Sequence, residues 1–388
     1  NQWAIPLLHG AFSVWATELP KVRFAIMVGS FIPRVCLICR SLQEKATIEV
    51  WKGFDYRPIR KTIKMPRKSS KSVTLKLERT LDIAQRNWVS GDTHIHLNRR
   101  DKTEEAGALD LIEAEDICHR FLLGMNDTVT YTGTMDKQEW PQNLGMGRAS
   151  IVEENGYSLS SGQEYRCLTY GHICLLMGDA LVFNGDFLNP NDWPFFKDVA
   201  HETHRLNGLA IHAHVGYEQE IYADFIDVTT DGMELLQFAA YRGIGLEGLY
   251  HMLNAGHHFP ALGGSDFPYC RALGDCRTYA YLPRGHSVEE WTQAVADGRS
   301  FFTTGPVLEL SVNGAKPGDT IGTYGAEASV KVDIRVQSEV APLDMVDIIV
   351  NGKIVKTIAL ESNTLPVNTS AKTIIPFSES MWVSARGH

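Results

Sequence analysis

The sequence predicts an α/β protein in which a βα barrel, at residues 89–305, lies between two β-rich flanks, 1–88 and 306–388. Three observations support this prediction. Helix and strand patterns alternate through the middle of the chain, as they do in βα units. Both flanks contain segments with a period of two, which is typical of half-buried strands. Twelve of the fourteen histidines lie between His94 and His286, which indicates that the chemistry belongs to the middle unit.

The N-terminal flank ends in two alternating segments. Residues 47–50 and 73–77 alternate apolar and polar side chains, which predicts antiparallel strands with one buried face. Residues 1–40 show no pattern from which we predict an element. The stretch 52–79 is rich in lysine and arginine. We interpret it as the solvated face of strands, with a patch that binds polyanions or surfaces as the alternative.

Helix and strand candidates alternate in the middle unit. Three helix candidates end at or just before a glycine, a common signal at helix C-termini: 193–207, 246–255 and 287–298. The last of these opens with serine and has glutamate three residues later, which is the capping-box pattern. The first two helices are followed by short apolar runs, 209–211 and 259–262, which we predict to be strands.

The C-terminal flank is predicted to be a small β-sandwich. Residues 330–336 alternate between apolar and polar side chains over seven positions. The segment 348–355 contains two apolar runs around an Asn-Gly pair, which is the strongest short signal for a two-residue hairpin. Several short strands with regular turn signals are typical of a sandwich, here over residues 306–388.

Composition limits the partners of the chain. The 388 residues include 44% hydrophobic and 21% charged residues, and the net charge of -9 argues against a general nucleic-acid binder. No apolar run reaches the roughly 18 residues of a membrane span. We therefore expect a small-molecule substrate, and association into a homo-oligomer stays open. Because the chain begins with Asn1 rather than Met, we expect a processed or partial chain that is extracytoplasmic or secreted, with the cytoplasm as the alternative.

Candidate metal ligands lie at or near the ends of predicted strands. They are imidazole and carboxylate side chains: His94, His96, Glu164, His172, His212, His214 and Asp266. In a barrel of βα units, functional groups gather at the C-terminal ends of the strands. Nitrogen and oxygen ligands of this kind suit zinc, manganese or iron. The alternatives are that the His-x-His pairs are structural and that Glu164 is a surface residue.

Other catalytic motifs are absent from the sequence. It contains no GxSxG elbow, no GxxxxGK[ST] phosphate loop and no HExxH pair. Cys167 and Cys174 lie near Glu164 and His172, so a cysteine nucleophile is an alternative. Their apolar neighbours favour buried, inert thiols.

Five segments together resemble a known family. They are "GDTHIHL", "SGQEYRCLTYGHICLL", "NGLAIHAHV", "GGSDFP" and "GRSFFTTGPVLELSVNGAKPGDTI", in that order. Their sequence and order resemble the PHP (polymerase and histidinol phosphatase) superfamily, in its CehA/McbA branch of carbaryl-hydrolase-like metallohydrolases. The resemblance covers roughly residues 45–386, and the glycine-rich stretch after "TTGP" is quite specific to this branch.

The resemblance implies a distorted PHP-type βα barrel with metal ions at the strand ends. It implies one metal position held by His94, His96 and Asp266, and a second held by His172 and His214, with Glu164 bridging the two. His212 is the alternative ligand or an outer residue, and we keep it as a catalytic candidate. Asp92 is expected to orient a ligand histidine.

The sequence also departs from the family pattern. Many members carry an Asp-His pair after the next strand, where this chain reads "DTVTYTGTMD". Many also carry a histidine two residues after the Gly-Ser-Asp aspartate, where this chain has Pro268. Both missing histidines belong to the third metal of trinuclear relatives. We therefore expect two divalent ions, with zinc as the first choice and manganese or iron as alternatives.

The expected activity is metal-dependent hydrolysis of a carbamate, ester or amide bond. Paired divalent ions lower the pKa of water, and Asp266 is expected to take up the proton. Arg166 is the candidate for stabilising an oxyanion, together with Arg271 and Arg277. Two alternatives stay open: a phosphoesterase that uses the same metal site, and a metal-binding structural or binding protein without turnover.

Overall fold

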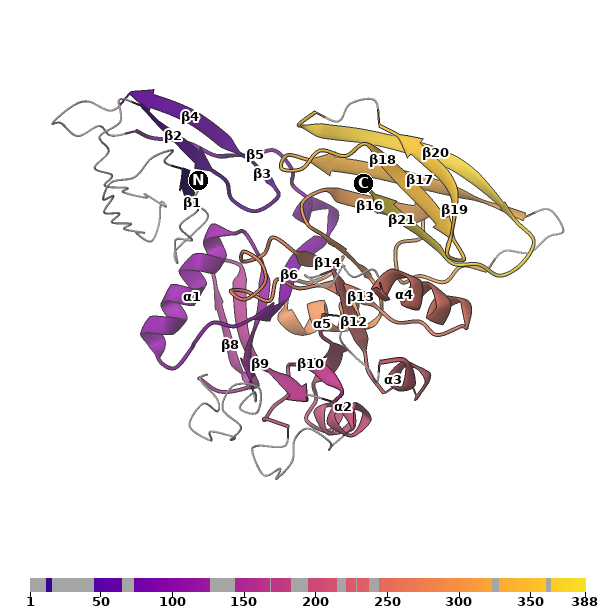
Figure 1. Cartoon of the computed structure of the whole chain (residues 1–388), viewed down its shortest axis with the longest axis horizontal. Helices are drawn as coiled ribbons and strands as arrows, with labels where there is room; N and C mark the ends of the chain where they lie inside the picture. The colour runs from indigo at the N-terminus through magenta and orange to yellow at the C-terminus, as the bar shows by residue number, and fades with distance from the viewer. Residues whose placement is uncertain are drawn as a thin grey trace.

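The computed structural model describes residues 12–15, 45–64, 73–125, 144–167, 169–182, 195–214, 221–227, 229–236, 244–322, 328–360 and 364–388. Within these ranges the chain forms a large central sheet, short helices and several smaller sheets (Figure 1). The predicted α/β class is therefore confirmed. None of the helices in these ranges has the length and apolar character needed to cross a membrane.

The central sheet curls into a nearly closed barrel. Its strands are β6 (Trp88–Ile95), β7 (His119–Met125), β8 (Gly147–Glu154), β9 (Tyr157–Cys167), β10 (Gly171–Leu176), β11 (Leu209–His212), β12 (Gly232–Leu236), β13 (Ala261–Gly263), β14 (Arg277–Tyr281) and β15 (Ser300–Thr303). They follow the order β13-β12-β11-β10-β9-β7-β6-β14-β15, and β8 pairs with β9. The hydroxyl of Thr278 in β14 accepts from the backbone N–H of Gly263 at 2.9 Å and lies 3.0 Å from its carbonyl oxygen. This side-chain contact brings β13, which is one end of the strand order, against β14, the strand next to the other end.

Strand direction distinguishes this sheet from a regular βα barrel. β6, β7 and β9 are parallel to one another, as are β11, β12 and β13. β10 is antiparallel to both β9 and β11, and β14 is antiparallel to β6 and β15. A β9–β10 hairpin therefore replaces one βα unit. The described residues also form few helices. The sheet therefore shows a barrel-like α/β fold and does not confirm the expected PHP-type βα barrel.

Four of the five described helices lie outside the barrel, and the fifth, α5, covers one end of it. They are α1 (Lys102–Ala114), α2 (Phe196–Arg205), α3 (Ile221–Asp227), α4 (Ile244–Asn254) and α5 (Val288–Ala296). α5 begins at the predicted capping box of Ser287 and Glu290. Its Trp291 is fully buried and donates to the carbonyl of Val89 at 2.9 Å. A Cβ on Gly91 would lie 2.3 Å from the Trp291 ring, so this close approach requires glycine. α5 thus covers the end of the barrel at which β6 and β7 begin.

The C-terminal flank forms two three-stranded sheets around one apolar core. Their strands are β16 (Val307–Val312), β17 (Ala328–Ser338), β18 (Met345–Val350), β19 (Lys353–Ala359), β20 (Val367–Phe377) and β21 (Val383–Gly387). The sheet orders are β16-β17-β20 and β19-β18-β21, and buried side chains from both, such as Ile334 and Val346, share a core. Asn351 and Gly352, at φ 47° and 81°, form the predicted β18–β19 turn.

The N-terminal flank is less regular than we predicted. It contains a sheet of β1 (Phe12–Trp15), β2 (Lys45–Val50) and β4 (Ile59–Lys64), and a pair of β3 (Tyr56–Arg57) with β5 (Glu78–Arg79). The short 3₁₀ helix η1 (Ala84–Arg86) leads into β6. The prediction of a strand at 73–77 was wrong, because that segment has no pairing partner among the described residues.

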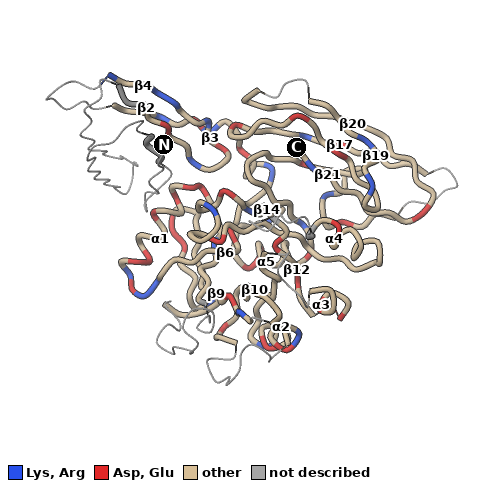
Figure 2. The backbone as a smooth tube through the Cα atoms, in the orientation of Figure 1, with Lys and Arg blue, Asp and Glu red and all other residues tan. Residues whose placement is uncertain are grey.

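In Figure 2 the backbone of β4, which lies within the basic stretch of the sequence, carries the blue colour of lysine and arginine positions. Arg60, Lys61 and Lys64 are exposed there, and Arg60 pairs with Glu49 of β2 at 2.9 Å. This exposure and pairing favour the interpretation as a solvated strand face.

Candidate metal centre

The predicted ligands meet at the end of the barrel opposite α5. His94 lies at the end of β6, and His96 and Asp266 follow β6 and β13. Glu164 belongs to β9, and His172 lies at the start of β10. Because β10 is antiparallel to β9, with His172 opposite Arg166, the start of β10 lies at the same rim as the end of β9. The hairpin therefore supplies a ligand position that a parallel βα unit would supply from a strand end.

The first donor group is His94, His96, Glu164 and Asp266. The Nε2 atoms of His94 and His96 are 3.1 Å apart. Asp266 Oδ1 lies 3.2 Å from His96 Nε2 and 3.6 Å from His94 Nε2. Glu164 oxygens lie 3.2 Å from His96 Nε2 and 3.5 Å from His94 Nε2. Ligands placed tetrahedrally around zinc are roughly 3.3 Å apart, so this spacing fits an ion among the four side chains.

The second donor group is Glu164, His172 and His214. His172 Nδ1 lies 3.0 Å from Glu164 Oε1 and 3.0 Å from His214 Nε2. His214 Nε2 lies 3.3 Å from the same carboxylate oxygen. The sets His94–His96–Glu164 and Glu164–His172–His214 each have their ligand atoms close enough together to hold a metal ion, and Asp266 forms a further such set with His94 and His214. Glu164 belongs to both donor groups and is fully buried, so the alternative of a surface glutamate was wrong.

The charged side chains at the rim favour the binding of positive charge, either protons or metal ions. Burial would raise the pKa of Glu164, but Arg166 and His94 hold this pKa well below its usual range. Burial would lower the pKa values of His94 and His96. Cys174, Glu234 and Glu164 nevertheless raise the pKa of His94, and Asp266 and Glu164 raise that of His96. A site that draws protons onto histidines offers metal ions the same negative field, and metal binding then releases those protons.

Arg166 is the predicted catalytic arginine that the structure brings to the site. Its Nε donates to Glu164 Oε2 at 2.8 Å, and its side chain is 14% exposed. Arg277 lies elsewhere: it is buried, donates to the backbone carbonyls of Gly274 and Glu115, and packs on the ring of Phe54. Arg277 therefore has a structural role.

His212 is not brought to the donor groups. Its Nε2 lies 3.1 Å from Asp224 Oδ2, and its ring packs between Phe196 and Phe225 outside the barrel. β11 ends at His212, and His214 has a φ of 31°, so the alternation of an extended strand does not continue between the two histidines. This backbone turn directs His214 alone to the rim, and the expectation of a catalytic His212 is corrected.

The expected role of Asp92 is also corrected. Its carboxylate accepts from the backbone N–H groups of His94, Ser265 and Gly274 at 3.0–3.2 Å, not from a histidine ring. Glu234 of β12, which our sequence analysis missed, lies 2.8 Å from His94 Nδ1 instead. The available signal was one glutamate in the apolar run "GMELL".

Comparisons with known proteins give no family assignment. No family model matches the chain, and no curated protein matches it. One similar solved structure is the crystal structure of PsfC from Pseudomonas syringae PB-5123, at 14% identity over 53% of this chain and 88% of that chain, with a TM-score of 0.37. Another is Endonuclease Q in complex with a 27-mer duplex substrate with an abasic lesion, at 15% identity over 56% of this chain and 58% of that chain, with a TM-score of 0.35. Both TM-scores are below 0.5, so neither similarity carries an argument about function.

Proposed function

We propose that the protein is a metal-dependent hydrolase of the PHP superfamily, similar to its CehA/McbA branch. One observation carries this proposal: two donor groups, each with one partly exposed histidine, share the buried carboxylate of Glu164 and consist only of imidazole and carboxylate ligands. We further propose two divalent ions, zinc first, and a small-molecule substrate with a carbamate, ester or amide bond.

Divalent ions at such paired positions supply Lewis acidity and acidify water. Residues of the chain then supply proton transfer and charge stabilisation. Asp266 Oδ2 accepts a hydrogen bond from the Cys270 thiol at 2.9 Å, and this carboxylate is placed to take up a proton and return it to the leaving group. The guanidinium of Arg166 adds a fixed positive charge beside developing negative charge on the carbonyl oxygen.

Among the described residues of the rim, some side chains are buried and others are exposed. The side chains of His94 and Glu164 are fully buried, whereas that of His172 is 29% exposed. Tyr269 is 63% exposed, and its ring centroid lies 5.3 Å from that of His96. Substrate access is therefore proposed between His172 and Tyr269.

The test is hydrolysis of matched chromogenic substrates by metal-free and zinc-loaded protein. We expect zinc-dependent release of nitrophenol from an aryl acetate or carbamate, little release from an aryl phosphate, and loss of activity in Glu164→Gln. The exposed Glu154→Gln in β8 is the matched control and should keep wild-type activity. Turnover of phosphate esters alone would support the phosphoesterase instead, and zinc binding without any turnover would support the inactive binding protein.

A further inference from the structure

We infer that Glu234 is a positioning residue that holds the metal-binding histidines from inside the barrel. The inference rests on the proposed metal site and extends it to a residue that contacts no substrate. Glu234 lies in β12 and is fully buried. A buried carboxylate is stable only when hydrogen bonds satisfy its oxygens, so its contacts show what it does.

The first contact sets the tautomer of His94. Glu234 Oε2 lies 2.8 Å from His94 Nδ1, while Nε2 of the same ring faces His96. With a carboxylate oxygen as the acceptor at this distance, the proton of a neutral His94 is held at Nδ1. The lone pair of Nε2 is then directed at the first donor group. Carboxylate partners of this kind orient metal-binding histidines and raise their basicity.

The second contact reaches the other donor group. The backbone N–H of His214 lies 3.4 Å from the same oxygen, Glu234 Oε2. This contact is long and goes through the backbone, so it supports the turn at His214 and does not involve the imidazole ring. Glu234 thus contacts one ligand from each proposed metal position, more closely in the first.

Two further residues hold Glu234 itself in place. The hydroxyl of Thr93 donates to Glu234 Oε1 at 2.7 Å. Gly264 leaves room on the same side, because a Cβ at that position would lie 2.4 Å from Oε1. The carboxylate is therefore fixed between a hydroxyl donor and an imidazole donor. Thr93 offers a way to disturb its orientation without removing its charge.

The experiment measures zinc affinity by competition with a chromophoric chelator. We expect Glu234→Gln to weaken the first zinc position about ten- to a hundredfold and the second position less. The buried Glu105, which pairs with Arg99 and Lys102 of the α1 region, supplies the matched control Glu105→Gln. This control should lose stability and keep wild-type zinc affinity. In the zinc-loaded protein, the NMR signal of the His94 Nδ1 proton should move when the amide replaces the carboxylate.

A Thr93 pair keeps the test decisive if Glu234→Gln does not fold. Thr93→Ser retains the hydroxyl and should bind zinc as the wild type does, whereas Thr93→Val should bind it several-fold more weakly. The inference would be overturned if Glu234→Gln bound zinc with wild-type affinity, or if folded Thr93→Ser and Thr93→Val bound it equally well. Glu234 would then only fill space inside the barrel. Wild-type protein that binds no zinc would remove the proposed function itself, so the two failures are distinguishable.

Discussion

Glu164 is the residue that makes one site out of two donor groups. Its Oε1 lies 3.0 Å from His172 Nδ1, and its Oε2 lies 3.2 Å from His96 Nε2. Arg166 donates to it at 2.8 Å, which keeps the buried carboxylate ionised and oriented. A carboxylate with its oxygens turned to both groups is placed to be shared by the two ions that we propose.

We predict that Glu164→Gln loses more zinc than His172→Ala. The first substitution removes a ligand from both positions, and the second removes one ligand from a single position. Zinc affinity should fall by at least about tenfold at both positions in Glu164→Gln. Elemental analysis after dialysis against a weak chelator measures the difference. Equal zinc contents in Glu164→Gln and the wild type would show that Glu164 does not bridge.

His119 makes stability depend on pH away from the metal centre. It is buried at the start of β7, its Nδ1 lies 2.7 Å from the Ser158 hydroxyl, and burial lowers its pKa to about 3. In the unfolded chain a histidine has a pKa of roughly 6.5. Between these values the unfolded chain binds a proton that the folded chain does not, so stability is lost as the pH falls below 6.5.

We predict that His119→Gln reduces this loss of stability at acidic pH. The histidine should remove about 2 kcal/mol of stability between pH 6.5 and pH 5, and glutamine, which can still bond Ser158, should not. Urea unfolding at pH 5, 6 and 7 gives the two slopes. Parallel slopes for wild type and variant would mean that His119 is protonated in the folded protein.

The sequence predicted the metal ligands better than the residues that hold those ligands in position. The strand-end positions of His94, His96 and Glu164 could be inferred from local sequence, and the structure places them 3.1–3.5 Å apart. The sequence could not show which of His212 and His214 faces the metal centre, because their orientations differ through a backbone turn that no residue type predicts. Glu234 was missed because its partner lies 140 positions away in the chain.

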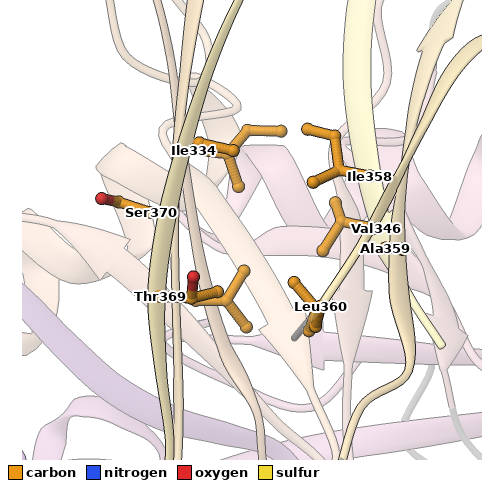
Figure 3. Close-up of a pocket in the computed structure, with 9 residues that line it drawn as sticks. Ile334, Val346, Ile358, Ala359, Leu360, Thr369 and Ser370 are labelled. Atoms are coloured by element: carbon orange, nitrogen blue, oxygen red, sulfur yellow. The ribbon is translucent and has the colours of Figure 1, made fainter. Parts of the chain in front are cut away.

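At the scale of elements, the two C-terminal sheets leave a gap between them. Figure 3 shows Ile334, Val346 and Ile358 facing this gap, while the Ser370 hydroxyl points away. The cavity measures about 150 Å³ and lies between the two sheets, lined by residues of β17, β18, β19 and β20. Interiors normally pack without such voids, so this part of the sandwich has packing energy to gain.

We predict that Ala371→Val, which adds two carbons beside this cavity, stabilises the protein by about 1 kcal/mol. Ile334→Ala enlarges the same cavity and should cost about 2–5 kcal/mol. Denaturant unfolding of both variants measures the changes. A destabilised Ala371→Val would show that the side chains have closed the gap.

Elements defined by local signals were predictable, whereas their arrangement was not. The capping box before α5 and the Asn351-Gly352 hairpin are read from adjacent residues, and the structure contains both. The antiparallel direction of β10 depends on the short turn after β9, and the same apolar run would suit either direction. Closure between β13 and β14 depends on Thr278, which is one hydroxyl in a strand.

At the scale of the whole molecule, one aromatic cluster joins the barrel to both flanks. Trp88 packs against Phe301 at 4.9 Å, and Phe54 and Val307 belong to the same buried cluster. The indole of Trp88 donates to Glu309 of β16 at 3.1 Å. Phe301 and Phe302 are half-buried in β15. Arg57 adds an ion pair between the flanks, to Glu339 at 3.0 Å.

We predict that residues 89–305 do not form a stable protein by themselves. Cutting there removes Trp88, Val307 and Glu309 and exposes the apolar surface they cover, at about 2 kcal/mol for each large buried side chain. The fragment should be insoluble or should unfold without cooperativity. A soluble, zinc-loaded fragment that unfolds in one cooperative step would contradict this prediction and make the C-terminal sheets a separable module.

The central claim is that two ions share Glu164 at one end of the barrel. Anomalous diffraction from crystals of the zinc-loaded protein, measured on both sides of the zinc edge, locates the ions without reference to activity. Two peaks are predicted, one among His94, His96, Glu164 and Asp266, and one among Glu164, His172 and His214. No peak at the rim, or a single peak that Glu164 does not contact, would contradict the account.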